Sequence, residues 1–356
     1  MSARQPSKVL KLKAGDWVEV RGQAEILATL DEHARFENLP LMPEMLQYCG
    51  QRFRVASRAD KTCDPAHTPW SIRRMGNAVH LEGVRCGGEQ HGGCQAGCLM
   101  WWKEAWLKRV SFLSPQSSAE PSRMSVGVSF PRSVDVIHAA TRSTNAEGET
   151  VYSCQATDVR KFTSYMMWYD PRQYIRDVRS GNLCGGRALN SKSERLLELI
   201  LGILQAIRSF FISFFAERRL LNYPAITGST PKGPVGNLNL QPGELVQVRS
   251  KEEIIATLDK HRRNRGLLFD GEMLRYCDGI FTVLRRVDRI IDERTGKMIQ
   301  MKYPSVILDG VACKSDYHRL CPRAIYHYWR ESWLARVGEG ARVCAREREV
   351  ETCERV

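Results

Sequence analysis

The sequence predicts an α+β protein built mainly of small β-barrels, in which two tandem copies of one unit flank a partly helical segment. Three observations lead to this prediction. A segment near the N-terminus recurs 228 residues later, and both copies alternate short β-branched stretches with turn residues. The region between the copies contains a long apolar run with helical spacing.

The internal repeat is visible as a series of matches that keep the same order. Gly15 to Asp31 recurs as Gly243 to Asp259, and ten of the 17 positions are identical. Three further pairs follow: Glu44 to Cys49 with Glu272 to Cys277, Val79 to Cys86 with Val306 to Cys313, and Trp102 to Leu107 with Trp329 to Leu334. Chance does not preserve this order over about 95 residues, so the chain contains a duplication.

Each copy is expected to consist of short strands and long loops. In the first copy the pattern predicts strands over 16–21, 53–58 and 79–84, and an aromatic closing element near Trp106. Helical turns are predicted around 26–30 and ending at 48–49. The alternation of apolar and polar residues in the strands indicates that each one is buried on one face.

The opening Gly15-Asp16-Trp17-Val18-Glu19-Val20, with short strands and decorated loops after it, resembles the SH3-like barrels, including the KOW type. The resemblance covers about 60 residues of each copy and implies two tandem SH3-like repeats. The whole chain also resembles an uncharacterised bacterial family built from this duplicated unit, which carries a Cys/His loop. That second resemblance implies no function.

The repeat sets the expected domain boundaries. They are a first repeat over 1–113, a Ser/Pro-rich linker over 114–125, a central α+β and helical segment over 126–240, a second repeat over 241–337, and a charged tail over 338–356. In the central segment, Pro171 to Val178 is predicted to be a helix that ends before Gly181.

A loop rich in cysteine and histidine is the most specific indication of chemistry in the sequence, because its residues could bind a metal ion. Thiolates and imidazoles are the usual ligands of structural zinc, and glycine-rich turns let such ligands converge. The first copy carries Cys63, Cys86, His91, Cys94 and Cys98, and the second carries Cys313, His318 and Cys321. Ile325 aligns with Cys98, and Ile291 aligns with Cys63.

Two zinc arrangements are open. In one, Cys63, Cys86, Cys94 and Cys98 form a four-cysteine site in the first copy alone. In the other, the Cys-x4-His-x2-Cys set binds zinc in both copies, and a further residue such as Cys49 or Cys277 completes it. The alternative to both is a set of buried thiols with a hydrogen-bonded histidine.

Residues 196–216 form the most apolar stretch of the chain. Glu198 and Arg208 are its only charges, and a stripe of polar and small residues follows one helical face. Phe210, Phe211 and Phe214 belong to the remaining apolar surface. Three interpretations compete: a buried helix packed between the repeats, a helix lying in a membrane interface, and a membrane-spanning helix.

The charge balance bears on partners. Lys and Arg number 53 against 40 Asp and Glu, a formal net charge of +13, which favours polyanions such as nucleic acid or an anionic membrane. Basic residues expected in loops could contact phosphates or simply be solvated; they are Arg73, Arg74, Arg262, Arg263 and Arg265. The first ten residues lack the apolar core of a secretory signal, which predicts a cytoplasmic protein with membrane association through 196–216 as the alternative.

The sequence favours a non-enzymatic binding or scaffold protein whose two zinc-stapled modules present grooves to a protein or peptide partner. Two alternatives stay open: a nucleic-acid-binding protein that uses its basic loops, and a metal-dependent enzyme or redox factor that uses the Cys/His loop. No catalytic residue is predicted. The chain has no P-loop or HExxH motif, and Cys154, His138 and Asp158 match no triad signature.

Overall fold

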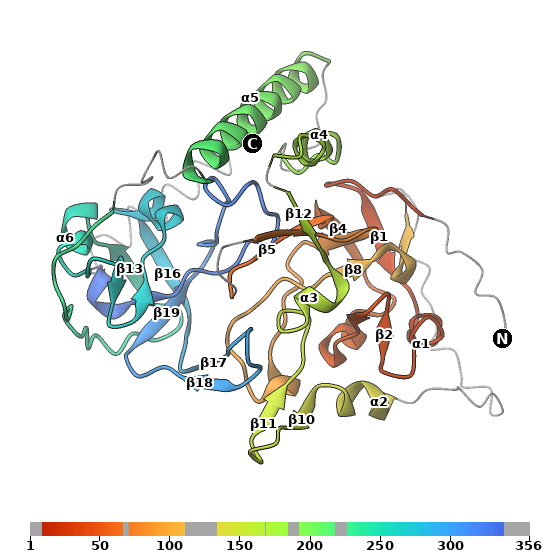
Figure 1. The fold of residues 1–356 in the computed structure, drawn as a ribbon, viewed down its shortest axis with the longest axis horizontal. Coiled ribbons are helices and arrows are strands. Elements are labelled where there is room, and N and C mark those ends of the chain that lie inside the picture. The colour runs from red at the N-terminus through yellow and green to blue at the C-terminus, as the bar shows by residue number, and fades with distance from the viewer. Residues whose placement is uncertain are drawn as a thin grey trace. The chain divides into compact units, whose positions relative to one another are not determined.

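The computed structural model describes residues 9–66, 71–110, 134–167, 169–183, 192–217 and 226–337. Over these ranges the chain is a mixed α+β protein with small antiparallel sheets and a few helices (Figure 1), which confirms the predicted class. The expectation of closed barrels is corrected, because the end strands of each sheet in the described residues do not pair with each other. The expected linker at 114–125 and tail at 338–356 lie outside the described residues.

The chain divides into two compact units. The first unit comprises Met1–Phe214 with two later segments, Ile291–Met298 and His318–Arg323, and the second unit comprises the remainder. Both later segments come from the second sequence copy, so the second copy contributes part of the first unit.

One five-stranded antiparallel sheet forms the centre of the first unit, in the spatial order β8-β7-β4-β1-β9. Its strands are β1 (Trp17–Val20), β4 (Arg52–Arg58), β7 (Ala78–Leu81), β8 (Trp102–Lys103) and β9 (Leu107–Arg109). In β1, Val18 and Val20 are fully buried while Glu19 between them is partly exposed, as expected for a strand with one face in the core. The strands predicted for the first copy are confirmed as β1, β4 and β7.

The second unit contains a sheet of the corresponding strands in the same relative order, β20-β19-β16-β13-β21. These strands are β13 (Leu245–Val248), β16 (Ile280–Arg286), β19 (Ser305–Leu308), β20 (Trp329–Arg330) and β21 (Leu334–Arg336). In each sheet a short 3₁₀ turn joins the last two strands; the turns are η3 (Glu104–Trp106) and η5 (Glu331–Trp333).

Shorter elements connect these sheets and extend them. The helices are α1 (Gln23–Leu27), η1 (Pro43–Tyr48), η2 (Glu89–His91), α2 (Val134–Ala139), α3 (Val159–Phe162), α4 (Arg172–Arg179), α5 (Lys192–Glu217), α6 (Lys251–Ile255) and η4 (Gly271–Tyr276). The small sheets pair β2 (Arg35–Phe36) with β3 (Leu39–Pro40), β10 (Arg142–Thr144) with β11 (Thr150–Tyr152), β14 (Arg263–Asn264) with β15 (Leu267–Leu268), and β17 (Arg289–Ile291) with β18 (Met298–Gln300). A three-stranded sheet consists of β5 (Lys61–Asp64), β6 (Ser71–Arg74) and β12 (Ser164–Met166), with β6 in the middle.

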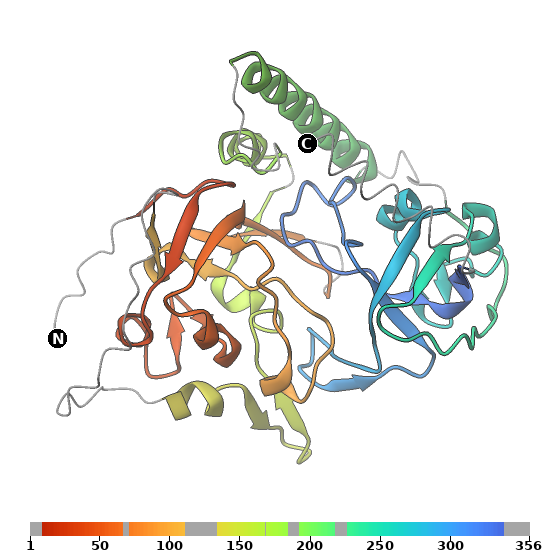
Figure 2. The same ribbon diagram turned by 180° about the vertical axis from the view of Figure 1, so that it is seen from behind.

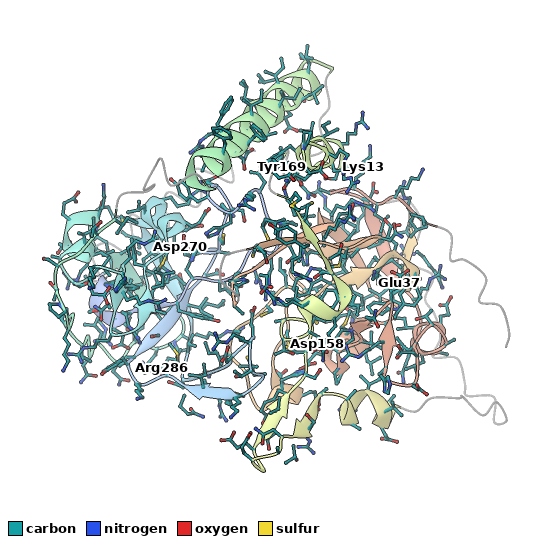
Figure 3. All side chains as sticks on the ribbon, in the orientation of Figure 1. Lys13, Glu37, Asp158, Tyr169, Asp270 and Arg286 are labelled. Atoms are coloured by element: carbon teal, nitrogen blue, oxygen red, sulfur yellow. The ribbon has the colours of Figure 1, made fainter. Side chains whose placement is uncertain are left out.

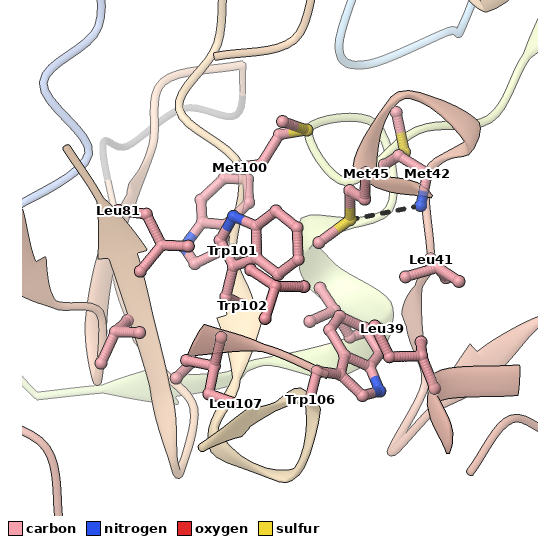
Figure 4. Packing of buried hydrophobic residues seen from close by; sticks show 14 of the residues in the cluster. Leu39, Leu41, Met42, Met45, Leu81, Met100, Trp101, Trp102, Trp106 and Leu107 are labelled. Atoms are coloured by element: carbon pink, nitrogen blue, oxygen red, sulfur yellow. Dashed lines mark hydrogen bonds between the residues drawn. The ribbon is translucent and has the colours of Figure 1, made fainter. Parts of the chain in front are cut away.

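Tryptophans fill the core of each unit. Trp101, Trp102 and Trp106 are fully buried in the first unit (Figure 4), and Trp329 and Trp333 are fully buried in the second. Their aromatic neighbours lie at tilted or edge-to-face angles, the arrangement that ring quadrupoles prefer. These side chains pack the core, so they are not free to line a binding groove.

A buried glutamate fastens the start of each copy to its sheet. The Glu104 carboxylate accepts hydrogen bonds from the backbone N–H groups of Leu10, Lys11 and Leu12 at 2.7, 3.0 and 2.9 Å, and from Arg58 Nη1 at 2.8 Å. The same arrangement surrounds Glu331, whose partners are Leu238, Asn239, Leu240 and Arg286, the last labelled in Figure 3.

Helix α5 turns its small and polar residues inward and its large apolar residues outward. Helix α5 lies near α4 (Figures 1 and 2). Gly202, Ala206 and Ser209 are buried, and the rings of Phe210 and Tyr174 of α4 meet edge-to-face with their centroids 5.9 Å apart. The outward side chains are 43–59% exposed; they are Leu196, Leu197, Leu199, Ile200, Leu201, Ile203, Leu204, Ile207 and Phe211. The interpretation of this segment as a buried helix is therefore wrong, because nine of its large apolar side chains are at least 43% exposed.

Candidate metal centre

The candidate centre lies in the long loop between β7 and β8. A bridge between Arg85 and Leu99 and a 2.9 Å hydrogen bond from Cys86 N to Cys98 O close the base of this loop. Inside it, Gly88 has φ +84°, and a Cβ atom there would lie 1.9 Å from the carbonyl oxygen of Cys94. Only glycine fits this position, so the sequence allows the loop to fold back tightly on itself.

Three potential metal ligands converge at this loop. The ligand atoms of Glu44, Cys86 and His91 all lie within 4.8 Å of one another. Glu44 Oε1 is 2.8 Å from His91 Nδ1 and 3.8 Å from Cys86 Sγ, and it also accepts a hydrogen bond from Gln90 N. Burial alone would raise the pKa of Glu44, but the hydrogen bond and charge of His91 outweigh it and lower the pKa. The three residues can hold a metal ion.

A small cavity of about 40 Å³ lies beside this group. Cys86, His91, Cys94, Cys98 and Cys154 line it together with apolar side chains. The thiols of Cys94, Cys98 and Cys154 lie outside the 4.8 Å group but share its cavity. Burial raises the pKa of Cys98 to about 12 and that of Cys154 to about 11, so both thiols stay protonated unless a cation replaces the proton.

Within the described residues, two buried atoms of the centre have no hydrogen-bond partner. They are Nε2 of His91 and Oε2 of Glu44. His91 is only 1% exposed and lines the cavity, so leaving Nε2 unpaired costs free energy unless a ligand occupies the space. The Glu44 carboxylate holds Nδ1 of the same ring, which is the usual way in which a carboxylate orients a metal-binding histidine.

The second copy has a related but reduced set of ligands. The ligand atoms of Glu272, Cys313 and His318 also lie within 4.8 Å of one another. Glu272 Oε1 accepts a 2.7 Å hydrogen bond from Tyr317 N, as Glu44 does from Gln90 N. The second copy lacks a counterpart of the Cys98 thiol, because Ile325 occupies the aligned position.

The structure separates two of the predicted ligands from these groups. Cys63 lies in β5, where its backbone N–H donates to Cys321 Sγ at 3.0 Å. Cys63 is therefore not part of the group that contains Cys86. Likewise, Cys321 is not part of the group that contains Cys313. Cys49 does not line the cavity and packs against the core of the first unit instead.

The arginines expected in loops make contacts inside their own units. Arg73 and Arg74 lie in β6, not in a loop, because this strand pairs with both β5 and β12. Arg73 donates to Thr163 O at 2.8 Å. Arg263 donates to Gly266 O and Arg265 donates to Gly233 O, each at 2.8 Å. Arg262, with φ +62°, lies immediately before β14.

Compared with protein-family models, curated proteins and solved structures, this chain matches none. The argument for its function therefore rests on the arrangement of its own residues.

Sequence reasoning missed two members of the centre. Glu44 recurs as Glu272 within one of the matched segments, so a repeated acidic residue beside repeated cysteines was the available signal. Cys154 carried no such signal, because it has no counterpart in the second copy. The folded chain brings it from the central segment to the cavity of the first copy.

Proposed function

We propose that this chain is a non-enzymatic binding protein made of two SH3-like units, of which the first is stapled by zinc, with a protein or peptide as partner. The equal strand order of the two sheets, with a 3₁₀ turn before the last strand of each, supports the assignment of SH3-like units. The resemblance of the opening residues to the same class supports it independently.

His91 carries the zinc assignment, because its Nε2 atom is buried without a partner and the residue lines a cavity together with several thiols. His91 and Cys86 supply a nitrogen and a sulfur ligand, Glu44 orients the imidazole, and the neighbouring thiols complete the ligand set. Nitrogen and sulfur ligands are those that zinc prefers. Glu44 and His91 are buried and Cys86 is half-buried. A zinc ion enclosed by protein ligands stabilises the fold, whereas a catalytic zinc needs an open position for substrate. Burial therefore favours a binding protein over a metalloenzyme.

Metal content tests the proposal directly. Mass spectrometry of the purified chain is expected to find zinc, and Cys86→Ser and His91→Ala are each expected to remove one equivalent. Cys49→Ser is the matched control, because this thiol is half-buried in the same unit but outside the cavity, and it is expected to retain the zinc. A chain without metal, or zinc that survives both cavity substitutions, would contradict the assignment.

We propose, as a second function, that α5 attaches the protein to an anionic lipid surface. Its outward face exposes large apolar side chains from Leu196 to Phe211. The adjacent helix α4 exposes Arg172, Arg176 and Arg179, and α5 itself exposes Arg208. Apolar side chains beside arginines match an interface in which acyl chains lie next to negatively charged headgroups. Among the described helices, none is both long and apolar enough to cross a bilayer.

Vesicle flotation tests this attachment. The chain is expected to float with phosphatidylglycerol vesicles and to bind phosphatidylcholine vesicles more weakly, because the arginines lose their counter-charge. Replacing Leu204 and Ile207 by glutamine should weaken binding by about tenfold or more, since each loses exposed apolar area. Val235→Gln with Ile299→Gln is the control, since both side chains are similarly exposed but lie outside α5. Equal flotation of the two double variants would disprove the role of α5.

A further inference from the structure

A second sulfur cluster lies apart from the candidate metal centre. Cys63 in β5 and Cys321 in the segment His318–Arg323 meet within the first unit, although they are 258 residues apart in sequence. Both side chains are buried, with exposed fractions of 5% and 4%. The Cys321 sulfur accepts hydrogen bonds from Cys63 N at 3.0 Å and from the Cys63 thiol. The two sulfurs therefore form one hydrogen-bonded pair.

A buried guanidinium lies beside this pair. Arg323 is 1% exposed, donates to Cys63 O at 3.3 Å, and lies over the Trp101 ring at 5.3 Å. Its guanidinium also pairs with Glu293 at 2.6 Å.

The aligned residues Ile291 and Cys94 make the same contact between a backbone N–H group and a cysteine sulfur. Ile291 replaces Cys63 in this contact, so it contains one sulfur instead of two. Cys94 aligns with Cys321, and its sulfur accepts a 3.4 Å hydrogen bond from the N–H of Ile291, the residue that aligns with Cys63. The backbone-to-sulfur contact is thus common to both copies, but only the contact between Cys63 and Cys321 joins two cysteines, because Ile291 carries no thiol.

We propose that Cys63 and Cys321 form a reversible disulfide, with hydrogen peroxide as the oxidant. The Cys321 thiolate attacks one peroxide oxygen, the O–O bond breaks, and the leaving hydroxide takes up a proton to become water. The resulting Cys321 sulfenic acid is attacked by the Cys63 sulfur, which loses its proton, and a second water leaves as the S–S bond forms. Overall, two thiols are oxidised by two electrons and one peroxide is reduced to two waters. A thiol reductant reverses the bond.

The disulfide would link the segment His318–Arg323 of the second copy covalently to β5 of the first. This segment contributes Leu320 to a small apolar cluster with Tyr174 of α4 and Ala206 of α5. Oxidation would thereby fix the position of Leu320, against which Tyr174 of α4 and Ala206 of α5 pack, relative to β5.

Peptide mapping of the intact, metal-loaded chain tests this inference. After treatment with hydrogen peroxide, a non-reducing digest is expected to contain the Cys63 peptide joined to the Cys321 peptide, lighter by two hydrogens, and a phosphine reductant should separate them. In Cys63→Ser, dimedone is expected to trap sulfenic acid at Cys321. The control Cys49→Ser, which changes a half-buried thiol of the same unit outside the cavity, should form the linked peptide as wild type does.

Absence of the linked peptide from oxidised wild type, or linkage of Cys321 to another cysteine, would overturn the inference. Because the first measurement uses the wild-type chain, a variant that folds poorly cannot produce this result. Zinc content measured on the same samples separates this test from that of the metal centre. Cys63→Ser removes the disulfide and should leave the zinc in place.

Discussion

The repeated Glu104 and Glu331 show how single residues hold the ends of this fold. Each carboxylate accepts three consecutive backbone N–H groups and a hydrogen bond from an arginine. A carboxylate suits this position because it accepts several hydrogen bonds, and charge-assisted hydrogen bonds are stronger than neutral ones. Burial would raise the pKa of Glu104, but the hydrogen bonds from Leu12 and Arg58 more than compensate, and the pKa is lowered.

Replacing Glu104 by Gln is expected to lower the free energy of unfolding by about 3 kcal/mol, since Arg58 loses a buried carboxylate partner and the N–H groups lose a charged acceptor. Urea unfolding followed by tryptophan fluorescence measures the change. Glu331→Gln should cost a similar amount in the second unit. Glu32→Gln is the control, because its side chain is 83% exposed, and it should change stability by less than about 0.5 kcal/mol.

The difference between wild type and Glu104→Gln should depend on pH in one direction. Since folding lowers the pKa of Glu104, its contribution is complete above the ordinary value of 4.5 and is lost as the pH falls through the lower folded value. The two chains should therefore converge in stability below about pH 4.5. A difference that grows on acidification would contradict this assignment.

At the scale of elements, the sequence pattern predicted the strands of the first copy because alternation of buried and exposed residues is a local signal. β6 was not predicted, and Arg73 and Arg74 were expected in a loop, because this strand depends on its partners β5 and β12. The helix predicted at 171–178 is confirmed as α4. Its first-turn proline and following glycine are local signals of the same kind.

The loop of the candidate metal centre allows a test at the same scale. Gly88→Ala is expected to disrupt zinc binding, because the added Cβ would lie 1.9 Å from a backbone oxygen of the loop. Gly83→Ala is the matched control: Gly83 has φ +72° and nothing within 4 Å of an added Cβ. Gly83→Ala is destabilised only by the left-handed backbone conformation at this position, which costs a residue with a Cβ atom about 1–2 kcal/mol, and it should keep its zinc.

Chelator competition measures zinc affinity for both variants, and urea unfolding measures stability. We expect the affinity of Gly88→Ala to fall by at least tenfold while that of Gly83→Ala stays near wild type. If both variants lose zinc equally, the loss is explained by general destabilisation. The close approach of the backbone at Gly88 would then not be its cause.

At the scale of the whole molecule, the two sequence copies do not coincide with the two compact units. The second copy contributes Ile291–Met298 and His318–Arg323 to the first unit. Aligned cysteines consequently have different surroundings. Cys94 lines the cavity of the candidate metal centre, whereas Cys321, at the aligned position of the second copy, lies beside Cys63. Two sites of different chemistry thus arise from one repeated loop.

The sequence by itself determined the duplication, the α+β class, the strands of the first copy and the presence of a Cys/His loop. Each of these rests on identity between copies, on local periodicity, or on residue chemistry. Only the tertiary structure decided which cysteines meet, that Glu44 and Cys154 join the centre, and that α5 turns its apolar side outward. These depend on contacts between residues distant in sequence, and cysteine spacing within a loop does not reveal which other segment of the chain packs against it.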